Sequence, residues 1–182
     1  MLELKIKGKT VVTVDKPFIT ISGTKASETI ITWNDSGDIL QSPTFSVQAS
    51  DFIGRFLTIQ DTLFDDNGRH YYSNCYIEGA VDFNCGNAPM PILFLRLFVG
   101  VLQKCHLRSL SEGTRAITAQ QRQSPSKNTG FIFLGCNITG VESTVLGRPW
   151  GAYSKVVFVQ TYMSNVVLPQ GWENWGDPAK QR

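Results

Sequence analysis

Residues 60–86 read QDTLFDDNGRHYYSNCYIEGAVDFNCG, with Asp61 near the start of this stretch and Asp82 near its end. The interval between these two aspartates is too long for one helix face or one hairpin, but it matches one full coil of a parallel β-solenoid. Residues one coil apart in a solenoid stack about 4.8 Å above one another. If the chain winds in this way, we expect the two carboxylates to be neighbours on one face.

A short pattern recurs along the chain and supports the solenoid. The form apolar-x-x-Cys-x-apolar-x-small surrounds Cys75, Cys105 and Cys136, and a weaker copy has Asn165 in place of the cysteine. Its alternating positions predict one recurring strand in which Cys is a small buried filler. The two steps between successive cysteines are longer than the aspartate interval, and we attribute the excess to loops. A strand that recurs at such a period is typical of a solenoid.

The chain from the N-terminus to Gln60 consists of short β-rich segments separated by Gly, Asn, Asp and Ser turns. The expected strands are 9–14, 18–22, 29–33, 44–47 and 53–59. No stretch there keeps the helical period of apolar residues. An antiparallel β-sandwich is the competing fold. It is disfavoured because Asn67-Gly68 is the only clear tight-hairpin dipeptide between apolar runs.

The composition limits the classes of function. A chain of 182 residues fits one domain, which we place at 1–182, and its 42% hydrophobic and 18% charged content is that of a soluble globular protein. With a net charge of +2 and no Lys/Arg cluster, nucleic acid is not an expected partner. The apolar run 89–102 is too short for a membrane span and contains Arg96, so we expect a buried segment and no membrane contact. The cysteines form no CxxC pair and His70 and His106 make no ligand pattern with them, so no metal is predicted.

Several residue types fit ester chemistry, and each has a structural alternative. Asp61 and Asp82 can serve as nucleophile and acid/base, because close carboxylates push their pKa values apart; they can equally be a turn cap and a solvated strand residue. In the segment LGRPW, Arg148 can grip a carboxylate and Trp150 can stack on a sugar ring. A surface arginine and a core tryptophan are the alternative. Gln60 can donate to a developing oxyanion, or lie in a polar ladder.

These motifs occur together, and in the same order, in one known family. The segments 60–83 (with QDTL and VDF), 146–150 (LGRPW), 151–165 and 168–177 (LPQGWENWGD) resemble the plant pectinesterases, also called pectin methylesterases. Segments 16–33 and 43–60 resemble the N-terminal coils of that family. The resemblance implies an all-β, right-handed parallel β-helix, here shortened. It also implies a carboxylic ester hydrolase that demethylates the C6 methyl ester of galacturonate in pectin and releases methanol.

The resemblance implies catalytic roles at the matching positions. Asp82 matches the nucleophile. Asp61 matches the acid that protonates the leaving methanol and then acts as base on water. Gln60 matches a donor that stabilises the oxyanion.

Other positions match substrate contacts and a cysteine pair. Arg148 and Trp150 match residues that orient the nucleophile and contact the sugar, and Phe83 is a further substrate contact implied by the resemblance. Cys75 and Cys105 match a cysteine pair that is often disulfide-bonded. The resemblance implies no metal and no organic cofactor.

The resemblance also implies partners and a location. The substrate and main partner is pectin, as methylesterified homogalacturonan, and a proteinaceous pectinesterase inhibitor is a second partner. A monomer in the extracellular cell wall is expected. The N-terminal segment 1–14 alternates as a strand and lacks the features of a signal peptide.

The chain departs from the family pattern, which leaves a second functional hypothesis open. The family has an intervening segment, with a second Gln, between the strand that ends like 56–60 and QDTL; here Gln60 runs directly into DTL. Asn84 and Cys85 follow VDF where apolar residues are usual, segment 89–101 lengthens the interval between Cys75 and Cys105, and the chain stops after GDPAKQR. We interpret these differences as an internal deletion, an insertion and a truncated C-terminus. The alternative function is therefore a catalytically impaired chain that only binds pectin, or a defective splice or gene-model product.

Overall fold

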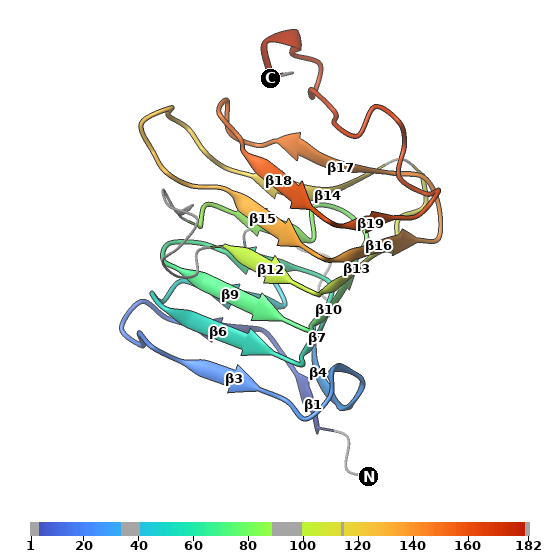
Figure 1. Cartoon of the computed structure of the whole chain (residues 1–182). Helices are drawn as coiled ribbons and strands as arrows, with labels where there is room; N and C mark the ends of the chain where they lie inside the picture. Colours follow the sequence, from blue (N-terminus) through green and yellow to red (C-terminus); the bar gives the residue numbers. More distant parts are fainter. Residues whose placement is uncertain (1–3, 34–40, 89–99, 114, 181–182) are drawn as a thin grey trace.

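The computed structural model describes residues 4–33, 41–88, 100–113 and 115–180, and over these ranges the chain is a stack of short parallel strands (Figure 1). Within these ranges nineteen strands form three sheets, here called A, B and C, and the chain visits A, B and C in turn in every coil. Every strand pair within these sheets is parallel, so the predicted all-β parallel solenoid is confirmed and the antiparallel sandwich is not.

The strands of each sheet follow one another in steps of three along the chain. Sheet A has the order β1 (Leu4–Lys7), β4 (Thr29–Thr32), β7 (Thr58–Gln60), β10 (Tyr76–Gly79), β13 (His106–Ser109), β16 (Asn137–Gly140) and β19 (Tyr162–Met163). Sheet B consists of β2 (Thr10–Val12), β5 (Phe45–Val47), β8 (Leu63–Asp65), β11 (Asn84–Gly86), β14 (Arg115–Gln120) and β17 (Thr144–Pro149). Sheet C consists of β3 (Thr20–Ser22), β6 (Phe52–Arg55), β9 (His70–Ser73), β12 (Val101–Gln103), β15 (Phe131–Leu134) and β18 (Val156–Val159).

Helical structure in the described ranges is limited to two single 3-10 turns, η1 (Ala26–Glu28) and η2 (Pro178–Lys180). None of the described helices is long and apolar enough to cross a membrane.

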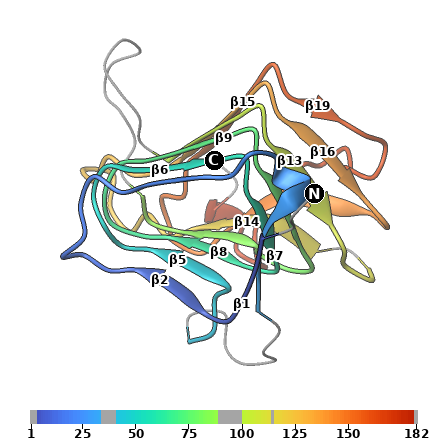
Figure 2. The same ribbon diagram turned by 90° about the horizontal axis from the view of Figure 1, so that it is seen from below.

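The core lies between the three sheets, as the view along the stack in Figure 2 shows. One inward aliphatic side chain per coil forms a column on sheet A, and each is at most 1% exposed: Ile31, Ile59, Ile77, Leu107 and Ile138. Burying each such side chain contributes about 1.5–3 kcal/mol. Because side chains alternate across a strand, the residues on either side of these positions face outward.

The recurring cysteine pattern marks a corner between two strands, so its interpretation as one strand was wrong. Each copy begins in a sheet C strand, turns at the residue before the cysteine and ends in a sheet A strand. The turning residues Asn74, Lys104 and Gly135 all have left-handed backbones, with φ values of 54°, 51° and 61°. A left-handed residue redirects the chain by breaking the extended conformation.

Because of the position of this corner, two further predictions were also wrong. Phe56 has a φ of 53°, so the predicted strand 53–59 is split into β6 and β7. Asn137 pairs with Tyr162, which places Thr161 in the column of cysteines. Asn165, predicted for that place, lies further along the chain, beyond β19.

The cysteines are buried free thiols, so the candidate disulfide between Cys75 and Cys105 is not formed in this structure. The pairing of Tyr76 with His106 puts the two cysteines one above the other in the column. In-register parallel strands hold equivalent atoms about 4.8 Å apart, whereas a disulfide needs Cβ atoms about 3.8 Å apart. The thiol of Cys75 instead donates to the carbonyl oxygen of Gly54 at 3.7 Å.

The sheets are continuous where the chain departs from the family pattern. Gln60 pairs with Thr32 of the coil below and with Glu78 of the coil above. Neither in-register neighbour of Gln60 in sheet A is therefore a second glutamine. The predicted buried segment 89–102 lies, apart from its last three residues, outside the described residues.

Candidate active site

Asp61 and Asp82 lie in the corners that join sheet A to sheet B in two consecutive coils. Asp61 directly follows β7, and Asp82 lies two residues before β11. Strands β8 and β11 pair Leu63 with Asn84, and each of these residues lies two positions after its aspartate. The one-coil spacing predicted for the two aspartates is thus confirmed.

Both aspartates have left-handed backbones, with φ values of 93° for Asp61 and 48° for Asp82. Backbone hydrogen bonds hold them there: the N–H of Asp61 donates to the carbonyl of Glu78, and that of Asp82 to the carbonyl of Ala116, each at 2.8 Å. Non-glycine residues with positive φ also turn other corners of this protein, so the strain alone does not mark a functional site. It does fix the direction in which each carboxylate projects.

Arg148 grips the carboxylate of Asp82. Its Nε donates to Oδ1 and Oδ2 at 3.0 Å each, and its Nη2 donates to Oδ2 at 2.5 Å. Asp82 is 6% exposed, and its partner comes from β17, two strands away in sheet B. The bidentate contact that the residue types predicted is therefore present.

Burial and charge act in opposite directions on Asp82. Burial raises the pKa of its carboxyl, the Arg148 guanidinium works to lower it, and the nearby negative charge of Glu173 adds to the rise, so the net direction is upward. The carboxylate of Asp82 raises the pKa of Arg148, which stays charged. Asp82 is thus an oriented carboxylate beside a permanent cation.

Asp61 is half-buried, and burial raises the pKa of its carboxyl. A raised pKa favours the protonated form, which a general acid requires. After burial itself, the charges of Asp82, Asp65, Asp66 and Asp61 are what raise the pKa of the buried Cys85 thiol. Asp61 and Asp82 are therefore both within electrostatic reach of the same side chain.

Gln60 directly precedes Asp61 in the chain, and Trp150 follows Arg148 by two residues. Both side chains are half-buried. The Nε2 of Gln60 donates to Oε1 of Glu78 at 2.9 Å. Trp150 packs against a small cluster on the outer side of sheet B, formed by Phe64, Cys85 and Ala119. Its indole therefore covers a buried patch and still has an accessible part.

The structure contradicts the prediction that Phe83 contacts a sugar. Phe83 is 0% exposed and belongs to the main core. It packs against Gly79, where an added Cβ would come within 2.5 Å of both the Phe83 Cβ and the Asp61 carbonyl oxygen. Phe83 thus supports the corner from inside, while Asp82 beside it faces outward to Arg148.

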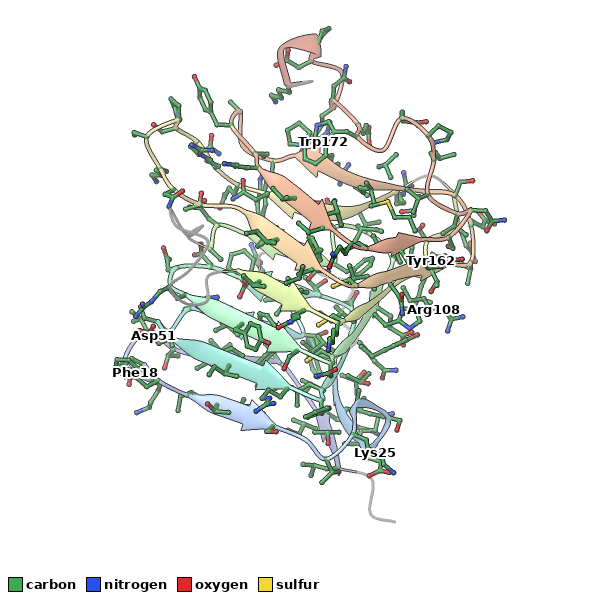
Figure 3. All side chains as sticks on the ribbon, in the orientation of Figure 1. Phe18, Lys25, Asp51, Arg108, Tyr162 and Trp172 are labelled. Atoms are coloured by element: carbon green, nitrogen blue, oxygen red, sulfur yellow. The ribbon has the colours of Figure 1, made fainter. Side chains whose placement is uncertain are left out.

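Trp175 lies at the site, and no role was predicted for it from the sequence. The Cζ of Arg148 lies 4.4 Å from the centre of its ring, and the residue is 48% exposed. A bridge between Gly147 and Trp172 brings this C-terminal segment over the last coil, where Figure 3 shows Trp172 above β17. Trp175 belongs to the motif LPQGWENWGD, which the sequence shows. Its contact with Arg148 could not be read from that motif.

A second aspartate, Asp65, is paired with a basic side chain inside the coil, that of His70. Asp65 Oδ1 contacts Nδ1 of His70 at 2.5 Å and accepts from the Tyr72 hydroxyl at 2.9 Å. The Nε2 of His70 lies 2.7 Å from the carbonyl oxygen of Ala49, so both ring nitrogens face acceptors. Burial alone would lower the pKa of His70, but the Asp65 carboxylate more than offsets this and the pKa is raised. His70, the first residue of β9, is therefore a fully buried strand residue whose surroundings favour the protonated ring.

Within the described ranges, no group of three or more His, Cys, Asp or Glu side chains is arranged to hold a metal ion. The side chains of Asp61, Asp82, Arg148 and Gln60 lie at the site, with the indoles of Trp150 and Trp175 nearby.

A parallel β-helix that carries an aspartate held by an arginine, one coil from a second carboxyl with a raised pKa, belongs to a class of solenoid proteins with an aspartate-based site. The sequence profile of the family described as Pectinesterase matches residues 54–181. Pectinesterase 11 of Arabidopsis thaliana is 48% identical over 203 aligned positions, which cover 95% of this chain and 55% of that protein. Pectinesterase QRT1 of the same plant is 41% identical over 128 positions, covering 70% of this chain and 31% of that protein. This chain belongs to the pectinesterase family.

The solved structures agree with the fold. Pectin methylesterase from carrot superimposes with a TM-score of 0.73 at 26% identity, and the match covers 97% of this chain and 67% of that structure. The chain spans about a third to a half of the length of the two plant relatives. The alignment of 203 positions is longer than the 182 residues of this chain, so the relative contains positions that have no counterpart here.

Proposed function

We propose that this chain is a carboxylic ester hydrolase that demethylates the C6 methyl ester of galacturonate in pectin and releases methanol. The observation that carries the proposal is the bidentate contact of Arg148 with Asp82, in a corner one coil from Asp61. Family membership supports the substrate class.

In the proposed mechanism, an oxygen of ionised Asp82 attacks the ester carbonyl carbon. The negative charge that develops on the carbonyl oxygen is stabilised by an N–H of Gln60. As the tetrahedral intermediate collapses, the bond to the methoxy oxygen breaks, and Asp61 gives its proton to the leaving methanol. The product is an acyl-enzyme in which Asp82 and the sugar carboxyl form an anhydride.

The second half of the cycle restores the enzyme. Asp61, now a carboxylate, takes a proton from water, and the resulting hydroxide attacks the acyl carbon and breaks its bond to the Asp82 oxygen. Asp82 leaves as a carboxylate, Asp61 keeps its proton for the next cycle, and the freed galacturonic acid loses its own proton to solvent. Arg148 keeps Asp82 ionised and oriented against the rise in pKa that burial causes. The half-exposed indoles of Trp150 and Trp175 supply apolar faces for the sugar rings.

The same proposal includes the surroundings of the enzyme. Methylesterified homogalacturonan is the partner, the plant cell wall outside the cell is the location, and the chain acts as a monomer. A proteinaceous pectinesterase inhibitor is the proposed protein partner. These points are what the resemblance to the plant pectinesterases implies, and the similarity to two plant relatives supports the resemblance.

The test is methanol release from highly methylesterified pectin by the purified chain. The proposal predicts release by the wild type and none above background after Asp82→Ala, with folding checked by circular dichroism. A folded wild-type chain that releases no methanol would refute the proposal.

A second function, pectin binding without catalysis, is favoured by one observation. Thr32 and Glu78, and no second glutamine, flank Gln60 in sheet A, and the plant relative has positions that this chain lacks. This alternative predicts no methanol but retention of the chain on immobilised polygalacturonate, weakened by Trp150→Ala. Methanol release by the wild type would exclude it.

A further inference from the structure

Glu78 lies on the outer face of sheet A, directly above a residue of the candidate site. The register of β10 places Glu78 over Gln60 in the coil below and under Arg108 in the coil above. In-register neighbours lie about 4.8 Å apart, so outward side chains at these positions reach one another.

Two contacts connect Glu78 to the candidate site. Its Oε1 accepts a hydrogen bond from Nε2 of Gln60 at 2.9 Å. Its backbone carbonyl accepts the N–H of Asp61 at 2.8 Å. One residue of the upper coil therefore holds the side chain of Gln60 and the backbone of Asp61.

The side-chain contact determines which end of the Gln60 amide faces which neighbour. An ionised carboxylate only accepts hydrogen bonds, so it selects the amide nitrogen and excludes the amide oxygen. The nitrogen carries two hydrogens, and Glu78 takes one of them. The other remains for a second acceptor, such as the oxyanion that forms in ester hydrolysis. An amide turned by half a rotation would present the wrong end to Glu78.

Glu78 is itself held in place. The Tyr76 hydroxyl donates to its Oε2 at 3.0 Å, so both carboxylate oxygens have donors. Arg108 donates to the Tyr76 hydroxyl at 3.4 Å and interacts with the charge of Glu78, and Figure 3 shows Arg108 projecting from this face. The ring of Tyr76 meets His106 edge-on, with ring centres 5.0 Å apart. The carboxylate is thus oriented, and a nearby cation balances its charge.

We propose that Glu78 is a positioning residue that fixes the amide orientation of Gln60, so that the second N–H of this amide serves the oxyanion. The inference rests on the proposed esterase function. It assigns Glu78 no contact with the reacting atoms.

Three variants test the role of the carboxylate in catalysis. Glu78→Ala should lower kcat on methylesterified pectin about 10-fold with KM unchanged, which is less than the roughly 10²–10³-fold that loss of the donor itself costs. Glu78→Gln should restore kcat to within about 3-fold, because its side-chain oxygen still accepts the hydrogen bond. Glu142→Ala is the matched control, since Glu142 is an exposed glutamate that accepts from the backbone of Gly113 and contacts neither aspartate in the structure. It should leave kcat unchanged.

A double-mutant cycle separates positioning from a general structural effect. In a Gln60→Ala background, Glu78→Ala should cause no further loss of kcat, because the group it positions is gone. An equal loss in both backgrounds, or an unchanged kcat in the wild-type background, would overturn the proposal.

A second readout keeps the test independent of activity. In a ¹⁵N-labelled chain, the side-chain amide proton of Gln60 that is bonded to Glu78 should resonate downfield of the usual glutamine range and exchange slowly with solvent, and Glu78→Ala should remove both properties. If the wild type releases no methanol, the proposed function fails, and the amide signals then decide the positioning role alone. Signals that are the same in both chains would contradict it.

Discussion

Among the described residues, Asp65 and Asp82 are each buried beside a basic side chain, and Asp82 belongs to the candidate site. Asp65 is 2% exposed and Asp82 is 6% exposed. Asp65 contacts His70, five residues further along the same coil, whereas Asp82 contacts Arg148, 66 residues away. The first pair is formed locally, and the second requires that several coils stack.

The two ion pairs differ mainly in how far solvent can reach the residues around them. His70 is 0% exposed and its ring nitrogens are both occupied inside the coil, so the Asp65 pair has no accessible partner position. The Arg148 side chain is 22% exposed, with the half-exposed Trp175 against it. The two pairs therefore differ in their access to solvent, and the proposed function assigns the reactive role to the accessible one.

The largest expected effect is on stability. Asp65→Ala leaves the imidazolium of His70 buried without its carboxylate, which should lower the free energy of unfolding by about 3–5 kcal/mol. Urea denaturation followed by tryptophan fluorescence measures this loss. Methanol release per folded molecule should stay the same, and a selective loss of activity in a fully folded variant would contradict the division between the two pairs.

Arg148→Ala should affect catalysis more than stability. Without the guanidinium, Asp82 loses its orientation and its counter-charge, and we expect kcat to fall roughly 10²-fold. Arg148→Lys should recover only part of the activity, because an ammonium cannot make the bidentate contact. Steady-state methanol assays measure both effects. Full activity of Arg148→Ala would contradict a role of Arg148 in orienting Asp82.

The Asp65 pair should make stability depend on pH in a direction that the structure fixes. The pKa of His70 is raised in the folded state. Its stabilising contribution is therefore fully present below the unfolded pKa, which is about 6.5, and is lost as the pH rises through the folded pKa. Comparing urea midpoints of the wild type and His70→Gln across this pH range isolates the contribution. The advantage of the wild type should shrink with rising pH, and a constant or growing advantage would contradict the buried imidazolium.

The smallest expected effect is at Trp175. Trp175→Ala removes the ring that lies against Arg148 and should lower kcat/KM by roughly 2- to 5-fold, the range for an exposed cation–π contact. Trp33 is another partly exposed indole, which directly follows β4 near the end of sheet A opposite to β19 and donates to Ser42, so it gives a matched control. Equal effects of Trp175→Ala and Trp33→Ala would mean that the contact with Arg148 does not matter.

The sequence predicted the coil spacing of Asp61 and Asp82 and the contact of Arg148 with a carboxylate, because both depend on residue type and interval. It did not predict the corners, since left-handed residues such as Phe56 and Lys104 carry no glycine-like signal. It also placed Phe83 outside, although a neighbour of an outward side chain in such a corner points inward.

Contacts that depend on register could not be predicted from the sequence. The hydrogen bond between Gln60 and Glu78 joins positions 18 residues apart, whereas Leu63 and Asn84 pair across a longer interval. Because strands and corners contribute different lengths of chain, different intervals are brought together within one stack. The pair of Asp65 and His70 was missed for a different reason, because two polar residues near a turn usually face solvent.

The most direct test of the account compares three chains in one methanol-release assay on highly methylesterified pectin: the wild type, Asp82→Asn and Asp65→Asn. Both substitutions remove a negative charge from a buried aspartate and keep its shape. If Asp82 is the nucleophile and Asp65 is structural, the wild type and folded Asp65→Asn should release methanol, and Asp82→Asn should release none above background. Release by Asp82→Asn at the rate of the wild type would contradict this assignment.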